Sequence, residues 1–396
     1  MRIAVVGAGV AGLAAAAALQ RASHDVTVYE RVPAERVVAG SGDGPSDQNP
    51  ASRPEGAQTD YAVPVWCNGA KALQDAGLAE VVAAAGEPIT SAEVIDRGGH
   101  PLFTFDAASM DAWVGSPSVM VSAAHLRAEL LARLSPGTVE FGRECVALAS
   151  HGSVATVGFS DRTEATCDLV IGADGIDSTV RSAVAPKTRI RQAGFGRWQA
   201  VTAFNWTYGA TTTLTSVANG HKIALHKLRG DRVGWSVSQN TRGPAQDWSR
   251  SDLESALDGW PSALQAPILA TPAPAIRFAQ EQDLYPLSRW QENRVVLIGD
   301  AAHAMTSGLG QGVSQALSDV PALVECLAAL IKVEDGLAQY ESARKMRAEV
   351  VVQQSAKVSR SEQRTGRAFT WVRKQLLQSA PAMYQRQLER FPTQQN

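Results

Sequence analysis

The chain has 396 residues, of which 45% are hydrophobic and 19% charged, and its net charge is −2 with a pI of about 6.4. This length suits two domains with a large core, and the balanced charge predicts no nucleic-acid partner. The four cysteines are scattered without metal-ligand spacing, no signal peptide opens the chain and no apolar run could span a bilayer, so we expect a cytoplasmic protein with reduced thiols, no metal and no membrane contact.

The chain opens with a predicted strand–helix–strand unit. Residues Arg2–Val6 are short, apolar and β-branched, which is typical of a buried strand. Residues 9–22 have a helical pattern with small side chains on one side, and His24–Glu30 alternates as a second strand. This order predicts a βαβ unit of an α/β fold.

A glycine motif joins the first strand to the helix. In Gly7-Ala8-Gly9-Val10-Ala11-Gly12, the first glycine permits a tight turn, the second lets the backbone approach a pyrophosphate, and the third lets helix and strand pack closely. The end of the second strand supplies an acid that can accept hydrogen bonds from an adenosine ribose. The predicted nucleotide contacts are Gly7, Gly9, Val10, Ala11, Gly12, Glu30 and Arg31. The motif alone does not distinguish NAD from FAD.

The middle of the chain contains a loop, helices and strands. Residues 39–60 are rich in Gly and Pro with almost no large apolar residue, so we expect a mobile surface loop that is dispensable for folding. Residues 71–84 and 123–134 have helical periodicity, and 139–159 has the pattern of strands. Residues 189–240 are rich in Trp, Thr and Val and predict an antiparallel sheet.

Buried strands are also predicted at Cys167–Gly172 and Arg294–Ile298. A helix is expected from about Gln311, and 333–388 is polar and helical.

Each of these two strands ends in an acidic glycine turn. The first turn is Gly172-Ala173-Asp174-Gly175, and Asp174 alone is as consistent with a structural turn as with a ligand contact. The second is Gly299-Asp300-Ala301-Ala302-His303, where Asp300 can accept from a polyol hydroxyl. Gly310-Gln311-Gly312 follows before a helix, whose start can stabilise negative charge on a flavin ring edge. His303 is assigned to packing and hydrogen bonding.

Taken together, these motifs resemble the group A flavoprotein aromatic hydroxylases, the para-hydroxybenzoate hydroxylase-like class, from residue 1 to about 345. The resemblance implies FAD, with NADH or NADPH as co-substrate, and an enzyme that inserts one oxygen atom of O2 into a small aromatic or otherwise electron-rich substrate through a flavin C4a-hydroperoxide. It also implies FAD contacts from Asp174, Gly299 and Asp300, while catalytic residues stay unassigned. The alternatives left open are a non-oxygenating FAD oxidoreductase and a flavin-binding protein without turnover.

The implied fold is a Rossmann-like FAD-binding domain of the glutathione-reductase type, interleaved with a mixed or antiparallel β-sheet substrate domain. The predicted FAD-binding domain comprises 1–75, 116–184 and 281–345, and the substrate domain comprises 76–115 and 185–280. Residues 346–396 form a C-terminal helical segment. We expect a monomer or a homodimer.

The chain departs from the family pattern at single positions. Ala123 stands where the family has an arginine that contacts FAD, Ser307 where it has a proline, and Ser314 where it has an asparagine. Trp66-Cys67-Asn68-Gly69 is similar to the Trp-Pro-Asn-Gly of urate-hydroxylase-like members.

The antiparallel segment is expected to cover the flavin and to bind the substrate. Its candidate substrate contacts are Arg197, Tyr208, His226 and Trp235, with Trp198 considered beside them. Lys222 and Lys227 raise flavin-dependent halogenation as a rival, but the Trp-x-Trp-x-Ile-Pro signature of halogenases is absent from the sequence.

Overall fold

The structure is a computed structural model that describes residues 1–34, 59–218, 220–241, 249–329 and 332–366. The loop predicted at 39–60 lies outside the described residues except for Thr59 and Asp60. The helical segment predicted at 333–388 is described only as far as residue 366.

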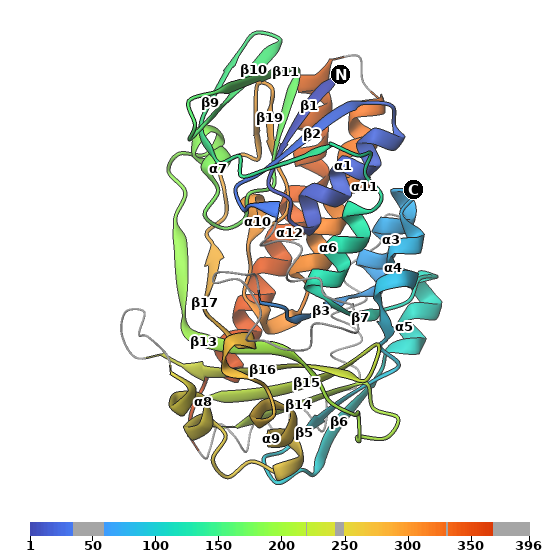
Figure 1. Cartoon of the computed structure of the whole chain (residues 1–396), viewed down its shortest axis with the longest axis vertical. Helices are drawn as coiled ribbons and strands as arrows, with labels where there is room; N and C mark the ends of the chain where they lie inside the picture. The colour runs from blue at the N-terminus through green and yellow to red at the C-terminus, as the bar shows by residue number, and fades with distance from the viewer. Residues whose placement is uncertain (35–58, 219, 242–248, 330–331, 367–396) are drawn as a thin grey trace.

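A six-stranded sheet forms one end of the molecule (Figure 1). Its strands, in spatial order, are β18 (Gln291–Glu292), β19 (Val295–Leu297), β12 (Leu169–Gly172), β1 (Arg2–Val6), β2 (Asp25–Glu30) and β8 (Val139–Phe141). All neighbours are parallel except the antiparallel pair β18–β19. Since β1, β12 and β19 run parallel, the three glycine motifs that follow them meet at one edge of the sheet.

Helices cover this sheet. They are α1 (Val10–Arg21), α7 (Thr179–Val184), α10 (Asp300–His303), α11 (Gly312–Ala329) and α12 (Val333–Glu362). The predicted βαβ unit is therefore confirmed, because β1, α1 and β2 are present with β1 and β2 parallel. The predicted helix after residue 311 is α11.

Smaller elements surround this layer. They are β3 (Ala62–Val65), α3 (Cys67–Asp75), α4 (Ala79–Ala85), β4 (Glu87–Pro88), α5 (Ala107–Val114), β7 (Val119–Ser122), α6 (Ala123–Leu131), β9 (Cys145–His151), β10 (Val154–Phe159) and β11 (Glu164–Cys167). The helix predicted over 71–84 is in fact two helices, because Gly77 adopts a left-handed φ of 75° that ends the first one.

A seven-stranded sheet forms the other end of the molecule (Figure 1). In spatial order it contains β17 (Arg277–Leu284), β13 (Ile190–Ala203), β16 (Arg232–Asn240), β15 (His221–Leu228), β14 (Thr213–Ala218), β5 (Ser91–Ile95) and β6 (Pro101–Asp106). The antiparallel sheet predicted over 189–240 is confirmed, and β17, β5 and β6 extend it from distant parts of the chain.

The two faces of this sheet have different surroundings. One face packs on α8 (Arg250–Ala256) and α9 (Ser262–Leu269), and its core includes Trp198, Leu225, Trp235, Leu253 and Leu257. Side chains alternate along a strand, so the residues between these point the other way, toward the six-stranded sheet. The inner face is therefore free to line a cavity.

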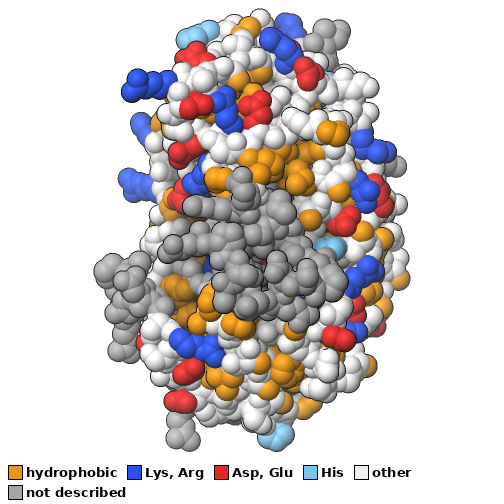
Figure 2. Space-filling model, in the orientation of Figure 1, with side chains coloured by type: hydrophobic (Ala, Val, Ile, Leu, Met, Phe, Trp, Pro, Cys, Tyr) orange, Lys and Arg blue, Asp and Glu red, His pale blue; other side chains and the backbone are white. Residues whose placement is uncertain are grey.

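The visible surface carries charges of both signs. On the face shown in Figure 2, Lys and Arg side chains are interspersed with Asp and Glu, and the described residues of that face form no basic patch. Within the described ranges, no helix is both long and apolar enough to cross a bilayer.

Candidate active site

A cavity of about 1260 Å³ lies between the two sheets. It extends from the glycine turn after β1, along α6 and the start of α11, to the inner face of the seven-stranded sheet. The end of α12 also contributes to its wall. The cavity therefore connects the nucleotide motifs with the sheet that is predicted to bind the substrate.

The glycines of the turn after β1 are required for different reasons, two of them for the fold and one for binding a ligand. Gly7 has a φ of 105°, and a Cβ on Gly12 would lie 2.0 Å from the carbonyl oxygen of Gly7, so both positions need glycine for the chain itself. A Cβ on Gly9 would meet nothing within 4 Å, and its φ of −74° suits any residue. Gly9 lines the cavity at the start of α1, where helix N–H groups favour an anion.

Glu30 closes the same turn from the end of β2. Its buried carboxylate accepts from the Ala8 N–H at 2.8 Å with one oxygen and from the Val32 N–H at 2.9 Å with the other. Each carboxylate oxygen has a second lone pair, so Glu30 can still accept from a hydroxyl in the cavity that it lines. Arg31 lies beside it in the same wall.

Arg127 of α6 is a cavity residue that the sequence analysis missed. Its Nε donates to the Ala8 carbonyl at 3.2 Å, which places the guanidinium at the glycine turn. Ala123 lies four residues earlier, one turn of the same helix, and lines the cavity as well. The signal was available, because residues four apart share one face of a helix.

Asp174 has the structural role that its sequence left open. Its carboxylate accepts from the Ser178 hydroxyl and from the Val180 N–H at 3.1 Å, so it stabilises the start of α7. It also lines the cavity. The neighbouring Arg181 donates to the carbonyls of Gly175, Ile176 and Ala301, which ties the first acidic turn to the second.

Asp300 faces the cavity from the turn after β19. Gly299 has a φ of 58° and a Cβ there would lie 2.9 Å from the Cβ of Ala11, so the turn packs directly on α1. Burial raises the pKa of Asp300, while His303 acts in the opposite direction. A carboxyl in this position is suited to bind a hydroxyl of a polyol.

Gly310 and Gly312 line the cavity where α11 begins, while Gln311 lies behind the wall. Gly310 adopts a left-handed φ of 61°, and its carbonyl accepts from the Trp66 indole at 3.1 Å. The Gln311 side chain accepts from the Asn68 amide at 3.2 Å. Trp66-Cys67-Asn68-Gly69 therefore supports this turn.

Ser314 completes the same contact. Its hydroxyl accepts from the Trp66 N–H at 3.0 Å, and a Cβ on Gly69 would lie 2.8 Å from the Cα of Ser314. The close approach of α3 to α11 thus depends on a glycine opposite a small side chain.

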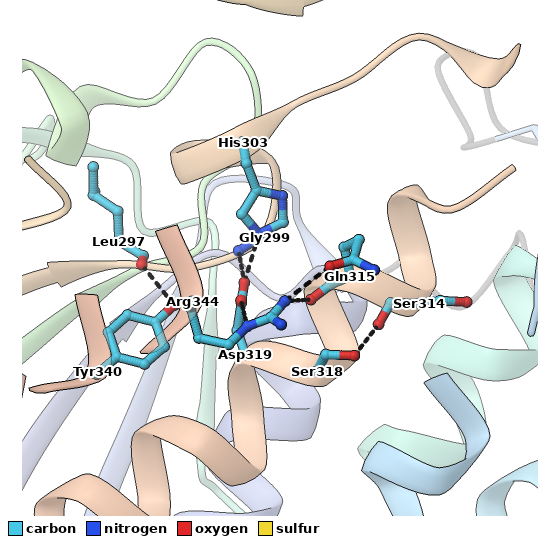
Figure 3. Close-up of polar contacts among 9 residues, drawn as sticks. All are labelled: Leu297, Gly299, His303, Ser314, Gln315, Ser318, Asp319, Tyr340 and Arg344. Atoms are coloured by element: carbon cyan, nitrogen blue, oxygen red, sulfur yellow. Dashed lines mark hydrogen bonds and ion pairs between the residues drawn. The ribbon is translucent and has the colours of Figure 1, made fainter. Parts of the chain in front are cut away.

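A buried ionic network lies behind the turn of β19 (Figure 3). Asp319 of α11 accepts from the Gly299 N–H at 2.8 Å, from His303 Nε2 at 2.7 Å and from Arg344 Nε at 2.9 Å. Arg344 of α12 also donates to the backbone and side-chain oxygens of Gln315. Burial raises the pKa of Asp319, but His303 and Arg344 outweigh it and hold the pKa below its usual value. The network fixes the strand end that carries Asp300.

The inner face of the seven-stranded sheet supplies the opposite wall of the cavity. Arg197 of β13 forms an ion pair with Glu281 of β17 at 2.9 Å, and Glu281 also accepts from the Ser307 N–H at 2.9 Å. A proline at position 307 would have no N–H, so the serine permits a contact that the family's usual residue does not. Lys222 pairs with Glu362 of α12 at 2.7 Å.

His226 lies on the same wall and is neutral at ordinary pH. Burial, and then the nearby charges of Lys222 and Arg197, lower its pKa to about 3. Its Nδ1 lies 3.5 Å from the Thr213 hydroxyl. The imidazole can therefore act as a neutral hydrogen-bonding group, and it carries no charge to attract an anion.

Two of the predicted substrate residues are placed elsewhere. The Tyr208 side chain does not line the cavity, because its hydroxyl donates to the Ala263 carbonyl and its ring packs on Trp206. Trp235 belongs to the core under α8 and α9, where its indole donates to the Thr271 hydroxyl at 2.8 Å. Although Trp235 touches the cavity wall, its ring points to the other face of the sheet. Of the four candidates, the structure brings Arg197 and His226 together.

Comparisons with known proteins agree with this geometry. Residues 67–355 match the FAD binding domain family, and residues 5–34 match an NAD(P)-binding Rossmann-like domain. The FAD-dependent urate hydroxylase of Mycolicibacterium vanbaalenii is 30% identical over 367 residues, covering 90% of this chain and 87% of that one. The aurachin C monooxygenase/isomerase of Stigmatella aurantiaca is 26% identical over 380 residues, covering 95% of this chain and 94% of that one.

The fold is also similar to that of a solved FAD-binding protein. Klebsiella pneumoniae HpxO in complex with FAD and uric acid superposes with a TM-score of 0.85 at 26% sequence identity, covering 99% of this chain and 95% of that one.

Proposed function

Because this chain belongs to the FAD binding domain family and is an FAD-dependent monooxygenase that uses NAD(P)H, we propose that its substrate is a planar aromatic heterocycle bound against the inner face of the seven-stranded sheet. The observation that carries the proposal is the single cavity that joins the Gly9 turn to Arg197 and His226. Relatives named for heterocyclic substrates support this class, since they include a urate hydroxylase and the 6-hydroxynicotinate 3-monooxygenase of Bordetella bronchiseptica.

The residues at the glycine turns fit FAD. The open space above Gly9 and the start of α1 would hold its diphosphate, with Arg127 as a nearby cation. Glu30 would accept from the adenosine ribose and Asp300 from a ribityl hydroxyl. Gly310 and Gly312 would place backbone N–H groups at the ring edge before α11.

When bound and reduced by NAD(P)H, the flavin supplies the activation of O2 that lets one oxygen atom reach the substrate. The chain itself orients the substrate and excludes water, because the cavity wall is formed by packed strands and the end of α12. Position is the main contribution of the protein, since reacting atoms must come within about 3–3.5 Å.

The proposal is tested with the purified FAD-loaded enzyme and a panel of hydroxylated pyridines, quinolones, purines and phenols. We expect NAD(P)H consumption to rise with a heterocycle from this panel, with equimolar O2 uptake and a product that gains one oxygen atom from labelled dioxygen. Oxidation without incorporated oxygen would instead indicate a non-oxygenating oxidoreductase. Bound flavin without substrate-stimulated NAD(P)H consumption would indicate a flavin-binding protein without turnover.

We further propose that the enzyme works in the cytoplasm as a monomer or homodimer, with only small molecules as partners. The four cysteines support the location, since all are free and buried.

A further inference from the structure

The inner face of the seven-stranded sheet is arranged in rows of residues that lie opposite each other on neighbouring strands. One row, here called the central row, contains Gln199, Ser236, Ala224 and Thr215 of β13, β16, β15 and β14. All four residues line the cavity. Because Ser236 and Ala224 are short and lie between two longer side chains, the central row is a shallow floor on which a flat ring can lie.

Gln199 has the longest polar side chain of the central row, and Arg277 of β17 lies opposite it. Gln199 is only 3% exposed, and its Oε1 has no hydrogen-bond partner among the described residues. Leaving a buried polar group unpaired costs about 1–3 kcal/mol, so such groups are normally satisfied. Since Gln199 lies in the cavity wall, a molecule bound in the cavity can supply a partner for its carboxamide.

The neighbouring row carries charge, but each charge is already paired. Arg197 lies beside Ser238 and Lys222 across the strands, and its partner is Glu281 at 2.9 Å. The partner of Lys222 is Glu362 at 2.7 Å. An anionic group bound at this row would have to displace one of these carboxylates, whereas a neutral ring would leave both pairs intact.

The row on the other side of Gln199 is uncharged. It contains Val201, Gly234, His226 and Thr213, and His226 is neutral because burial and the nearby cations depress its pKa. The two flanking rows thus offer hydrogen bonds without an unpaired charge. Arg277 of β17, which lies opposite Gln199 and also lines the cavity, packs over the Tyr61 ring at 5.2 Å.

We propose that the carboxamide of Gln199 recognises the lactam edge, an adjacent N–H and C=O, of a neutral planar heteroaromatic substrate. A carboxamide presents an acceptor oxygen and a donor NH2 side by side, so it can form two hydrogen bonds with such an edge. Rotation of the amide by half a turn lets it match a ring that enters in either sense. This inference rests on the proposed function and narrows its substrate class.

The test measures binding to the FAD-loaded enzyme through the change that a ligand causes in the flavin absorption spectrum. The probes are quinolin-2(1H)-one, which has a lactam edge, and its N-methyl derivative, which has lost the N–H. We expect the unmodified enzyme to bind the lactam about tenfold or more tightly, since losing one hydrogen bond leaves the glutamine oxygen unpaired.

Gln199→Leu is expected to bind both probes equally, with its affinity for the N-methyl probe close to that of the unmodified enzyme. Gln199→Met, which is nearly isosteric, is expected to behave the same way and serves if the leucine variant loses FAD. The control is Gln239→Leu on β16, because Gln239 also has an unpaired buried Oε1 but does not line the cavity. It should keep the preference for the lactam.

Equal binding of the two probes by the unmodified enzyme, or a preference that survives in both Gln199 variants, would overturn the inference. The proposed function fails separately. An enzyme that hydroxylates a heterocycle but does not prefer lactams keeps the proposed function and loses this inference. An enzyme that binds the lactam through Gln199 but incorporates no oxygen keeps the inference and loses the proposed function.

Discussion

Among single residues, the three glycines of the first turn are distinguished by what surrounds them. Gly7 and Gly12 are constrained by the neighbouring backbone, whereas Gly9 is constrained only by the space that the cavity leaves open. The sequence motif predicts this division, with the second glycine reserved for the pyrophosphate, and the structure has open space above that glycine alone among the three.

Replacement of Gly9 by alanine should leave the flavin-free chain as stable as the unmodified chain and should weaken FAD binding about tenfold or more. The new methyl group meets no protein atom within 4 Å but lies where the diphosphate would approach. Thermal unfolding and FAD titration by fluorescence measure the two effects. The matched variant Gly12→Ala should instead unfold at a lower temperature, because its Cβ would be 2.0 Å from the Gly7 oxygen. Unchanged FAD affinity in Gly9→Ala would contradict this assignment.

His226 should make stability depend on pH in the acid range. Its pKa in the folded chain is about 3, below the ordinary value of 6.5, so between these values the unfolded chain binds a proton that the folded chain does not. Stability therefore falls as the pH drops from 6.5 toward 3, by at most about 1.4 kcal/mol per pH unit from this group.

Urea unfolding at pH 7 and pH 5 tests this contribution. His226→Gln, which keeps a polar side chain without a titrating group, should lose less stability between the two pH values than the unmodified protein. His151→Gln at an exposed position of β9 is the control and should lose as much as the unmodified protein. An equal loss in all three proteins would show that His226 titrates normally.

At the scale of elements, α10, α11 and α12 are joined by the network around Asp319 (Figure 3). The network has no atom in the cavity wall, because neither Asp319 nor Arg344 lines it. It acts on the cofactor site through the Gly299 N–H, which precedes Asp300.

Arg344→Met should destabilise the fold by about 3–5 kcal/mol, because it leaves the buried carboxylate of Asp319 with one cationic partner fewer. FAD affinity should also fall, measured below the new unfolding temperature, since the turn that carries Asp300 loses its support. Arg344→Lys, which keeps the positive charge, should retain part of the stability and part of the FAD affinity that Arg344→Met loses. Lys345→Met, which removes the neighbouring cation from the same helix, should change FAD affinity little. Normal FAD affinity in Arg344→Met would confine the network to a structural role.

The elements also show what could be predicted from sequence. The glycine turns were readable, since left-handed backbone and close packing leave a local signature in Gly7, Gly299 and Gly310. The residue patterns alone did not predict that strands β5, β6 and β17 join the second sheet, because their pairing joins distant parts of the chain. Only the family resemblance placed 76–115 in the substrate domain.

Long-range packing also explains why Trp235 was predicted to contact the substrate while Gln199 was missed. Trp235 and Gln199 belong to neighbouring strands, and which face each side chain takes depends on where α8 and α9 pack. Once Arg197 is placed on the inner face, the period of two along a strand selects Gln199 and rejects Trp198. The predicted roles of the individual cofactor residues stay predictions.

At the scale of the whole molecule, α12 connects the two sheets. Near its start Tyr340 donates to the Leu297 carbonyl of β19, and at its end Glu362 pairs with Lys222 of β15. The Asn240 side chain also donates to the Gln363 carbonyl just after α12, at 2.8 Å. The division of the chain into 1–75, 116–184 and 281–345 against 76–115 and 185–280 remains a prediction.

Glu362→Gln should keep FAD bound but lower the amount of product formed per NAD(P)H, with hydrogen peroxide released instead. The variant weakens the contact that closes the substrate end of the cavity, so water should enter more easily. The measurement is hydrogen peroxide formed per NAD(P)H consumed with a confirmed substrate. Glu254→Gln removes an exposed ion pair with Arg250 on α8 and should keep normal coupling. Normal coupling in Glu362→Gln as well would show that α12 does not seal the cavity.

The two-faced seven-stranded sheet has a consequence for how this protein can change over time. Side chains at alternating positions of each strand point to opposite faces of the sheet. The large side chains that pack on α8 and α9 lie on one face, and the central row lies on the other. Mutations in the central row therefore alter the ligand wall while the stabilising core stays intact. Selection for a new substrate can act on Gln199, Ser236, Ala224 and Thr215 with little penalty in folding, and a library randomised at these four codons is the natural starting point for engineering a different ring preference.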